Sequence, residues 1–343
     1  MDTPDGFTAW HTIGHQRAVN SLDRGLREGR LSHAYLLVGP ARVGKMTLAK
    51  ELAQAVNCLG ETRPCGDCGQ CRRVASCLHP DVRVIGVESQ TSGDGRNRVT
   101  IGIDQVREIQ RQASLKPYEG SHRVFIFDGA ELLSEEAANS LLKVLEEPPD
   151  QVVLVLLAAD AESLLPTIVS RCIRLDLRPL SPSLVARELM ARYEVGRERA
   201  DEIARLSGGR LGWAIQATNE PELLEHHETA LVEIEAATAA GLEERFSYAA
   251  RLATSFGEQR EPTRKELGLW LEWWRDVMLI NQGASEMVTN LSRLESLRTT
   301  AESLSTAQIV SGIEAIRTAA EYLDRNVNPR LTLEDLMLAL PRP

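Results

Sequence analysis

The stretch GPARVGKM at residues 39–46 has the residue types and spacing of a phosphate-binding loop. Gly39, Gly44 and Lys45 fit the pattern G-x-x-x-x-G-K-[ST], in which backbone N–H groups surround the phosphates and the lysine adds a positive charge. The last position should carry a hydroxyl that holds Mg²⁺, but Met46 stands there, and a thioether is a poor ligand for that ion. The motif predicts a degenerate nucleotide site, at which binding of ATP or ADP stays open. The alternative is a glycine turn that only packs a strand against a helix.

An acidic residue at the end of an apolar strand is the second part of such a site, and Asp128 ends the run RVFIFD at 123–128. Gly129 follows it, and Glu131, two residues further on, is expected to face elsewhere. Thr47 does not simply replace the missing hydroxyl, because one step along a helix turns a side chain by about 100°. Asp128 is therefore a candidate nucleotide-site residue, and its alternative role is to cap a helix or loop.

Four of the six cysteines lie close together in the run CLGETRPCGDCGQC, namely Cys58, Cys65, Cys68 and Cys71. Four thiolates around tetrahedral Zn²⁺ explain this spacing, and they leave no open position for a catalytic water. The sequence predicts a structural zinc site within 58–77. Free buried thiols are a poor alternative, because the run is too polar to form a core.

The tripeptide SRC at 170–172 places Arg171 between Ser170 and Cys172. On its own this is weak evidence for a function, because an ordinary surface arginine would give the same letters. A second isolated feature is LWLEWWRDV, in which Trp270, Trp273 and Trp274 fall on one helix face, as expected for a buried core or a subunit contact.

Elements that could position these residues alternate between strand and helix in the first half of the chain. Apolar strands are expected at 34–38, 82–87, 123–128 and 152–159, and helices at 45–57, 103–115 and 134–149. Continuous apolar strands that alternate with helices predict a parallel sheet covered on both faces. The polar, glycine-containing stretch 88–98 predicts a loop.

After residue 178 only helical patterns remain. The sequence therefore predicts three parts: an α/β nucleotide-binding-like core at 1–178, a small helical domain at 179–219 and an all-α domain at 220–343. The length of 343 residues agrees, because single domains average roughly 100–200 residues.

Composition restricts the class of protein further. The net charge of −10 provides no general basic surface for nucleic acid, so any DNA contact must be local or come from partner chains. No apolar run reaches the roughly 18 residues of a membrane span, and the first residues do not resemble a signal sequence. A cytoplasmic protein without a membrane partner is expected.

Together these features resemble the bacterial DNA polymerase III clamp-loader subunits of the AAA+ class, and most closely the delta-prime branch. The matching stretches are GHQRAVNSLDRGLREGRLSHAYLLVGPARVGK, the four-cysteine module, HPDV, IGIDQVREIQ, AANSLLKVLEEPP, LLPTIVSRC and NVNPRLTLEDL. The resemblance implies an AAA+ core with a zinc-module insertion, a helical lid and a collar that joins a hetero-pentamer with tau/gamma and delta subunits. Such a ring grips the sliding clamp and primer–template DNA, and its ATP turnover loads one onto the other.

The resemblance has different consequences for ATP hydrolysis in the tau/gamma branch and in the delta-prime branch. The ATP-hydrolysing tau/gamma motor has a hydroxyl after the loop lysine, a glutamate after the strand-end aspartate, a polar residue ending the next strand and an arginine in the lid. This chain has Met46, Gly129, Ala158/Ala159 and Gly212 there, although Arg210 makes the last match depend on register. These departures imply a subunit without hydrolysis of its own.

In the resemblance Arg171 is an arginine finger that acts in trans on a neighbour's ATP, positioned by Ser170 and Cys172. Such fingers stabilise charge that develops on the transferred phosphoryl group. The chain would then have no independent activity inside the polymerase holoenzyme. Two alternatives remain at this point: an autonomous ATP-hydrolysing motor of the tau/gamma type, indicated by Lys45 and Asp128, and a zinc-dependent DNA-binding module.

Overall fold

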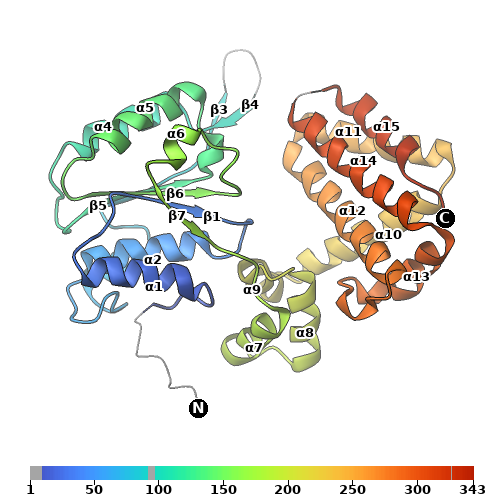
Figure 1. Ribbon diagram of the computed structural model, residues 1–343, viewed down its shortest axis with the longest axis horizontal. Coiled ribbons are helices and arrows are strands. Elements are labelled where there is room, and N and C mark those ends of the chain that lie inside the picture. Colours follow the sequence, from blue (N-terminus) through green and yellow to red (C-terminus); the bar gives the residue numbers. More distant parts are fainter. Residues whose placement is uncertain (1–9, 92–96, 326) are drawn as a thin grey trace. The chain divides into compact units, whose positions relative to one another are not determined.

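The computed structural model describes residues 10–91, 97–325 and 327–343. They form two compact units (Figure 1). The first unit extends to Val185 and includes Gly209–Trp213, and the second consists of Ala186–Gly208 and Ala214–Pro343. The predicted three-part division at 178 and 219 stays a prediction. Within the described residues, no helix combines the length and the apolar character needed to cross a bilayer.

A five-stranded parallel sheet forms the centre of the first unit. Its strands, in spatial order, are β2 (Val82–Ile85), β5 (Arg123–Asp128), β6 (Val152–Ala158), β1 (Ala34–Val38) and β7 (Ile173–Asp176). Every residue of β1 and β6 is buried, which explains why these runs are apolar throughout rather than alternating. The predicted α/β class with a parallel sheet is confirmed.

Helices cover both faces of this sheet (Figure 1). One face carries α1 (Gln16–Arg27) and α2 (Lys45–Asn57), and the other carries α4 (Ile103–Ala113), α5 (Glu135–Glu146) and α6 (Pro166–Val169). Ser134 caps α5 by accepting a hydrogen bond from the Ala137 N–H at 3.1 Å, as its position before an acidic first turn predicts. Two apolar cores result, one on each face of the sheet.

Because its strands run parallel, the sheet has a carboxyl edge and an amino edge. The carboxyl edge is where β1, β5 and β6 end, with Val38 beside Ala158 and Asp128 beside Leu157. The amino edge is where the strands begin, and it includes the start of β7 at Ile173, beside Tyr35 of β1. A parallel sheet brings residues that follow its strands to one edge and residues that precede them to the other.

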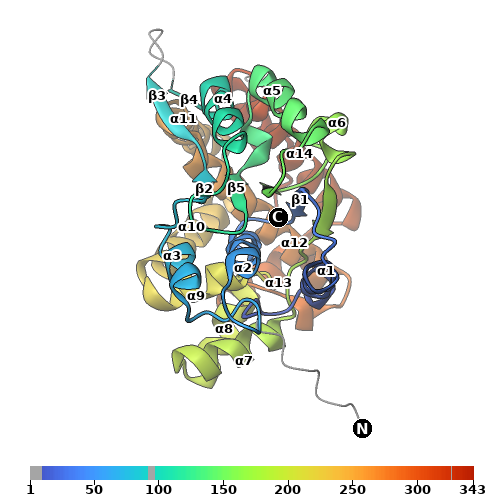
Figure 2. The same ribbon diagram turned by 90° about the vertical axis from the view of Figure 1, so that its left-hand side faces the viewer.

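Two smaller features complete the first unit. The short helix α3 (Gly69–Ala75) lies beside α2 (Figure 2). The stretch predicted as a loop is instead an antiparallel ribbon of β3 (Glu88–Thr91) and β4 (Asn97–Thr100), while 92–96 lie outside the described residues. The prediction failed because ladder hydrogen bonds join backbone groups, so a polar stretch can pair without an apolar pattern.

Helices make up the rest of the chain. Three short ones come first, α7 (Pro182–Tyr193), α8 (Arg197–Leu206) and α9 (Leu211–Asn219). The remaining α-helices are α10 (Glu222–Ala239), α11 (Leu242–Glu258), α12 (Arg260–Asn281), α13 (Leu294–Ser303), α14 (Thr306–Asp324) and α15 (Pro329–Ala339). The predicted absence of strands after residue 220 holds for the described part of this region.

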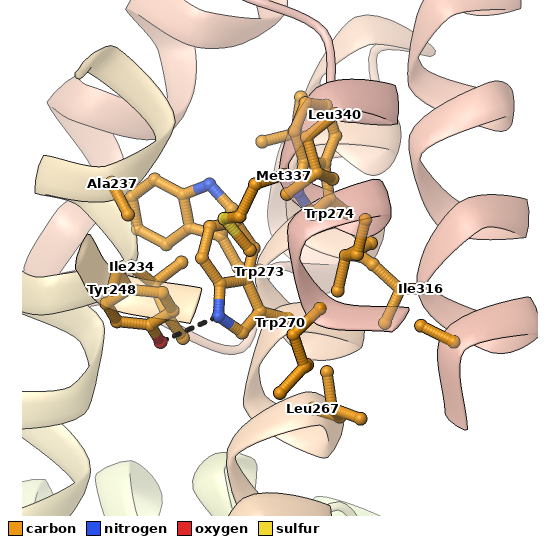
Figure 3. Close-up of a cluster of buried hydrophobic side chains, with 14 of the residues drawn as sticks. Ile234, Ala237, Tyr248, Leu267, Trp270, Trp273, Trp274, Ile316, Met337 and Leu340 are labelled. Atoms are coloured by element: carbon orange, nitrogen blue, oxygen red, sulfur yellow. Dashed lines mark hydrogen bonds between the residues drawn. The ribbon is translucent and has the colours of Figure 1, made fainter. Parts of the chain in front are cut away.

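The core of the second unit is built around α12 (Figure 3). Trp270, Trp273 and Trp274 are all fully buried there, as their spacing on one helix face predicts. The indole N–H of Trp270 donates a hydrogen bond to the Tyr248 hydroxyl at 2.9 Å. The fully buried Arg245 donates hydrogen bonds to the carbonyls of Met337 and Leu340, which ties α11 to the end of α15.

Candidate nucleotide, metal and arginine-finger sites

The loop after β1 has the backbone of a phosphate-binding loop. Gly39 has no room for a side chain, because a Cβ there would lie 2.2 Å from the Leu177 carbonyl oxygen. Gly44 has φ +117° and directly precedes α2, a conformation that favours glycine. The glycines therefore place the start of α2 at the carboxyl edge, as the motif predicts.

Lys45 points back into this loop. Its ammonium donates hydrogen bonds to the Gly39 carbonyl and, at 3.1 Å, to the Pro40 carbonyl. Burial lowers the pKa of Lys45, and the nearby carboxylates of Glu131 and Asp128 oppose that shift. The lysine is thus a positive charge held at the carboxyl edge, in the place where a phosphate would be bound.

Met46, which follows Lys45, packs against the core of the first unit. The half-buried side chain of Met46 packs against the apolar core beneath α1 and α2, while Thr47 is exposed. Divalent cations of the Mg²⁺ type need oxygen ligands, and Met46 offers none.

The acidic side of the loop differs in part from the prediction. Asp128 is exposed at the end of β5, and Gly129 has φ +82°, which starts the single turn η1 (Ala130–Leu132). This turn brings Glu131 back to the carboxyl edge, where its Oε1 accepts a hydrogen bond from the Ala159 N–H at 3.3 Å. The expectation that Glu131 faces elsewhere is wrong, because the left-handed glycine reverses the chain.

Gly212 lies directly against the loop. Its N–H donates a hydrogen bond to the Arg42 carbonyl at 2.9 Å, and a Cβ at position 212 would lie 2.8 Å from that same oxygen. A larger side chain could not fit here without moving the backbone. His15, which the sequence reading missed, holds the neighbouring Val43 carbonyl at 3.1 Å through its ring. The GH dipeptide at 14–15 was the available signal.

The predicted four-cysteine site is assembled. The sulfur atoms of Cys58, Cys65, Cys68 and Cys71 all lie within 4.8 Å of one another. Backbone N–H groups point at these sulfurs, from Gly60 and Cys65 to Cys58 and from Cys68 to Cys65, each at 3.3 Å. Such donors stabilise thiolates around a metal. The cluster could therefore hold a metal ion.

The thiols of this cluster differ in acidity. Burial acts to raise the pKa of Cys68, but hydrogen bonds from the N–H groups of Leu59 and Cys71 and from the neighbouring thiols lower it to about 6. Burial raises the pKa of Cys71. The spare candidate ligands are placed elsewhere: Cys77 is exposed, and His79 bonds to Gln70 and to the Asp81 N–H. Neither belongs to the cluster.

A buried polar network fastens this module to the sheet, and the sequence reading did not foresee it. Asp81, directly before β2, accepts hydrogen bonds from the N–H groups of Tyr118, Glu119 and Gly120 at 2.7–2.9 Å. It also pairs with Arg123 of β5 at 3.2 Å. The letters HPDV were the signal, since a buried aspartate requires partners of this kind.

Arg171 lies in the short connection between α6 and β7, at the amino edge. Its Nη2 forms an ion pair with Glu146 Oε1 at 2.7 Å, and its Nη1 donates to the Thr167 carbonyl at 2.9 Å and to Ser170 Oγ at 3.4 Å. Cys172 packs against the apolar core, and burial raises its pKa to about 12, so it is a packing residue rather than a reactive thiol.

Arg171 cannot serve the loop of its own chain. Gly39 lies against Leu177, which is six residues beyond Arg171 on the far side of β7. The four residues of β7 separate the two ends by roughly 13 Å, at about 3.3 Å per residue, and the Arg171 contacts lie at the amino edge. The structure therefore brings Gly39, Lys45 and Asp128 together at one edge and leaves Arg171 at the other.

Two family models match this chain: "DNA polymerase III, delta subunit" over residues 14–181 and "DNA polymerase III, delta subunit, C terminal" over residues 248–341. The tau/gamma subunit of Haemophilus influenzae is 33% identical over 179 residues, but the match spans 52% of this chain and 25% of that protein. DNA polymerase III subunit delta' of Bacillus subtilis is 29% identical over 327 residues, which is 94% of this chain and 95% of the relative.

The chain belongs to the DNA polymerase III delta-prime family of clamp-loader subunits. The match to a delta-prime subunit over 94% of the chain decides this against the tau/gamma motor, whose match spans 52% of the chain. Solved structures are more distant. The RuvB Holliday junction branch migration motor of Thermotoga maritima is 20% identical, with a TM-score of 0.41 over 60% of this chain and 61% of that one. The Bacillus subtilis clamp loader delta protein is 14% identical, with a TM-score of 0.33 over 94% and 98%.

Proposed function

We propose that this delta-prime family member is a non-hydrolysing subunit of a clamp loader, and that it helps to load the sliding clamp onto primed DNA. The observation that supports this most strongly is the separation of Arg171 from the chain's own loop. A guanidinium at the amino edge can serve only an ATP site on another chain. The carboxyl edge meanwhile lacks the hydroxyl at Met46 and the glutamate at Gly129.

Arg171 would act as an arginine finger in trans on the ATP of a neighbouring tau/gamma-type subunit. Its guanidinium would stabilise charge on the γ-phosphate as the bond to the β-phosphate breaks. Ser170 and Cys172 hold the connection in place, one through a hydrogen bond to Arg171 and the other through packing.

The other partners follow from the family. The chain would join tau/gamma and delta subunits in a hetero-pentamer through a collar at 220–343, with 179–219 as the lid of the core at 1–178. The assembly would contact the sliding clamp and primer–template DNA in the cytoplasm. The four cysteines would hold a structural Zn²⁺, which four thiolates bind without leaving an open position for water.

The degenerate loop would at most bind ATP or ADP passively. Gly39, Gly44 and Lys45 retain phosphate-binding geometry, and Thr47 and Asp128 remain nearby. Met46 stands at the position of the metal-binding hydroxyl and offers no oxygen, so any binding is expected to be insensitive to Mg²⁺.

The test replaces Arg171 with alanine in a loader reconstituted from all its subunits. We expect ATP hydrolysis stimulated by clamp and DNA to fall, while ring assembly persists. Arg174→Ala is the matched control, because Arg174 is an exposed arginine three residues away, paired with Asp176 at 2.8 Å. Hydrolysis equal to wild type in the Arg171 variant would overturn the finger role.

A further inference from the structure

We propose that Glu146 regulates the arginine finger by holding Arg171 on its own chain until a neighbouring γ-phosphate competes for it. This inference rests on the proposed function of Arg171. Glu146 is then a positioning residue, because it acts only through Arg171 and touches no nucleotide.

The contacts at Arg171 show a guanidinium that is already engaged. Glu146 takes Nη2 at 2.7 Å, while the Thr167 carbonyl and Ser170 Oγ take Nη1. A finger binds phosphate oxygens through these same terminal nitrogens, because the planar fork of arginine matches a pair of anionic oxygens. Arg171 must therefore give up at least part of its present contacts before it reaches a phosphate.

Charge makes Glu146 the partner that matters most. A carboxylate within hydrogen-bonding distance offsets the positive charge that the finger would lend to a reacting phosphoryl group. The γ-phosphate and Glu146 are both anions, so they repel each other and compete for one cation. The neutral oxygens of Thr167 and Ser170 carry no such conflict and can keep one end of the guanidinium in place.

The position of Glu146 makes its hold reversible. It is the last residue of α5, where the negative end of the helix dipole disfavours an acidic side chain, and Arg171 offsets this. The ion pair is half exposed, with the side chain of Glu146 50% and that of Arg171 34% accessible. Solvent weakens such a pair, so its loss should change an equilibrium by no more than about fivefold.

The same stretch contains its own control. Glu147 follows immediately, carries the same charge and has no ion pair among the described residues of the chain. Glu147→Gln removes one negative charge from the end of α5 and leaves the Arg171 contacts intact. Glu146→Gln removes the ion pair and keeps the side-chain shape. Neither residue is buried, so both variants should fold.

The experiment measures ATP hydrolysis by the reconstituted loader without clamp or DNA. Five forms of this chain are compared: wild type, Glu146→Gln, Glu147→Gln, Arg171→Ala and the double variant Glu146→Gln/Arg171→Ala. We expect Glu146→Gln alone to raise unstimulated turnover by about two- to fivefold, because the side chain at 146 then no longer competes as an anion with the γ-phosphate for Arg171. We expect Glu147→Gln to match wild type and the double variant to match Arg171→Ala.

The outcomes separate the two proposals. If Arg171→Ala leaves turnover unchanged with and without clamp and DNA, the finger role itself fails. If Arg171→Ala lowers stimulated turnover but Glu146→Gln does not raise the unstimulated rate, the finger stands and the hold by Glu146 is refuted. A rise that persists in the double variant also refutes it, because Glu146 would then act without Arg171.

Discussion

The two edges of one parallel sheet differ in what they have kept. At the carboxyl edge the backbone of a phosphate-binding loop survives, but Met46 packs into a core and Gly212 closes on the Arg42 carbonyl. At the amino edge, Arg171 is accessible, charged and held by three oxygen atoms. On the function that we propose, the fold has lost the chemistry of its own site and kept the one group that a neighbour needs.

The residues at the two edges have different structural roles. The loop also joins β1 to α2, so Gly39 and Gly44 are needed for folding whether or not nucleotide binds. Arg171 has no such role, because its ion pair is half exposed and surface pairs add little to stability. The proposed role in trans would explain its charge, and that role can be tested.

The largest effect should come from changing the shape of the finger without changing its charge. Arg171→Lys keeps a cation but loses the planar fork that binds two oxygens at once. A finger contributes on the order of 10³ to 10⁵ to the rate of hydrolysis. We expect the Arg171→Lys variant to hydrolyse ATP less than about tenfold faster than the Arg171→Ala variant. Single-turnover hydrolysis at the neighbouring site measures this. Full activity with lysine would mean that charge alone suffices at the amino edge.

A smaller effect should come from changing the four-cysteine cluster, because none of its residues belongs to the loop after β1 or contacts Arg171. In Cys71→Ser we expect bound zinc to fall from about one ion per chain to near zero and the melting temperature to drop, because metal binding and folding are linked. Metal analysis and thermal unfolding measure this, with the exposed Cys77→Ser as the matched control. Zinc retained in the Cys71 variant, or absent from freshly purified wild type, would contradict the assigned ligands.

The smallest effect should follow partial repair of the carboxyl edge. Met46→Thr restores a hydroxyl, but Gly129 still follows Asp128 and no water-polarising glutamate is added. We expect Mg²⁺ to tighten the binding of ADP by less than about tenfold, and we expect the isolated chain not to hydrolyse ATP. Titration with and without Mg²⁺ measures this. Hydrolysis gained from this single change would show that the edge is far less degraded than the structure indicates.

Much of this arrangement could be predicted from the sequence, because it depends on local patterns. The apolar runs predicted β1, β5 and β6, the cysteine spacing predicted the close group of four cysteines, and the tryptophan spacing predicted a buried helix face. The ribbon at β3 and β4 was missed, since pairing between polar segments leaves no hydrophobic period to read.

Contacts between residues far apart in the chain could not be predicted from the sequence, for a different reason. Glu146 and Arg171 are 25 residues apart, and Gly212 meets Arg42 across 170 positions. No single-sequence pattern links such pairs. The reversal at Gly129 was missed because one left-handed residue redirects Glu131, and a glycine after a strand is compatible with several turns.

The most direct test of the central claim compares one substitution at each edge in the same assembled loader. Lys45→Ala removes the charge of the carboxyl edge, and Arg171→Ala removes that of the amino edge. If the chain contributes chemistry only in trans, ATP hydrolysis stimulated by clamp and DNA should fall sharply with Arg171→Ala and stay within about twofold of wild type with Lys45→Ala. The reverse pattern, with loss at Lys45 and none at Arg171, would contradict the account.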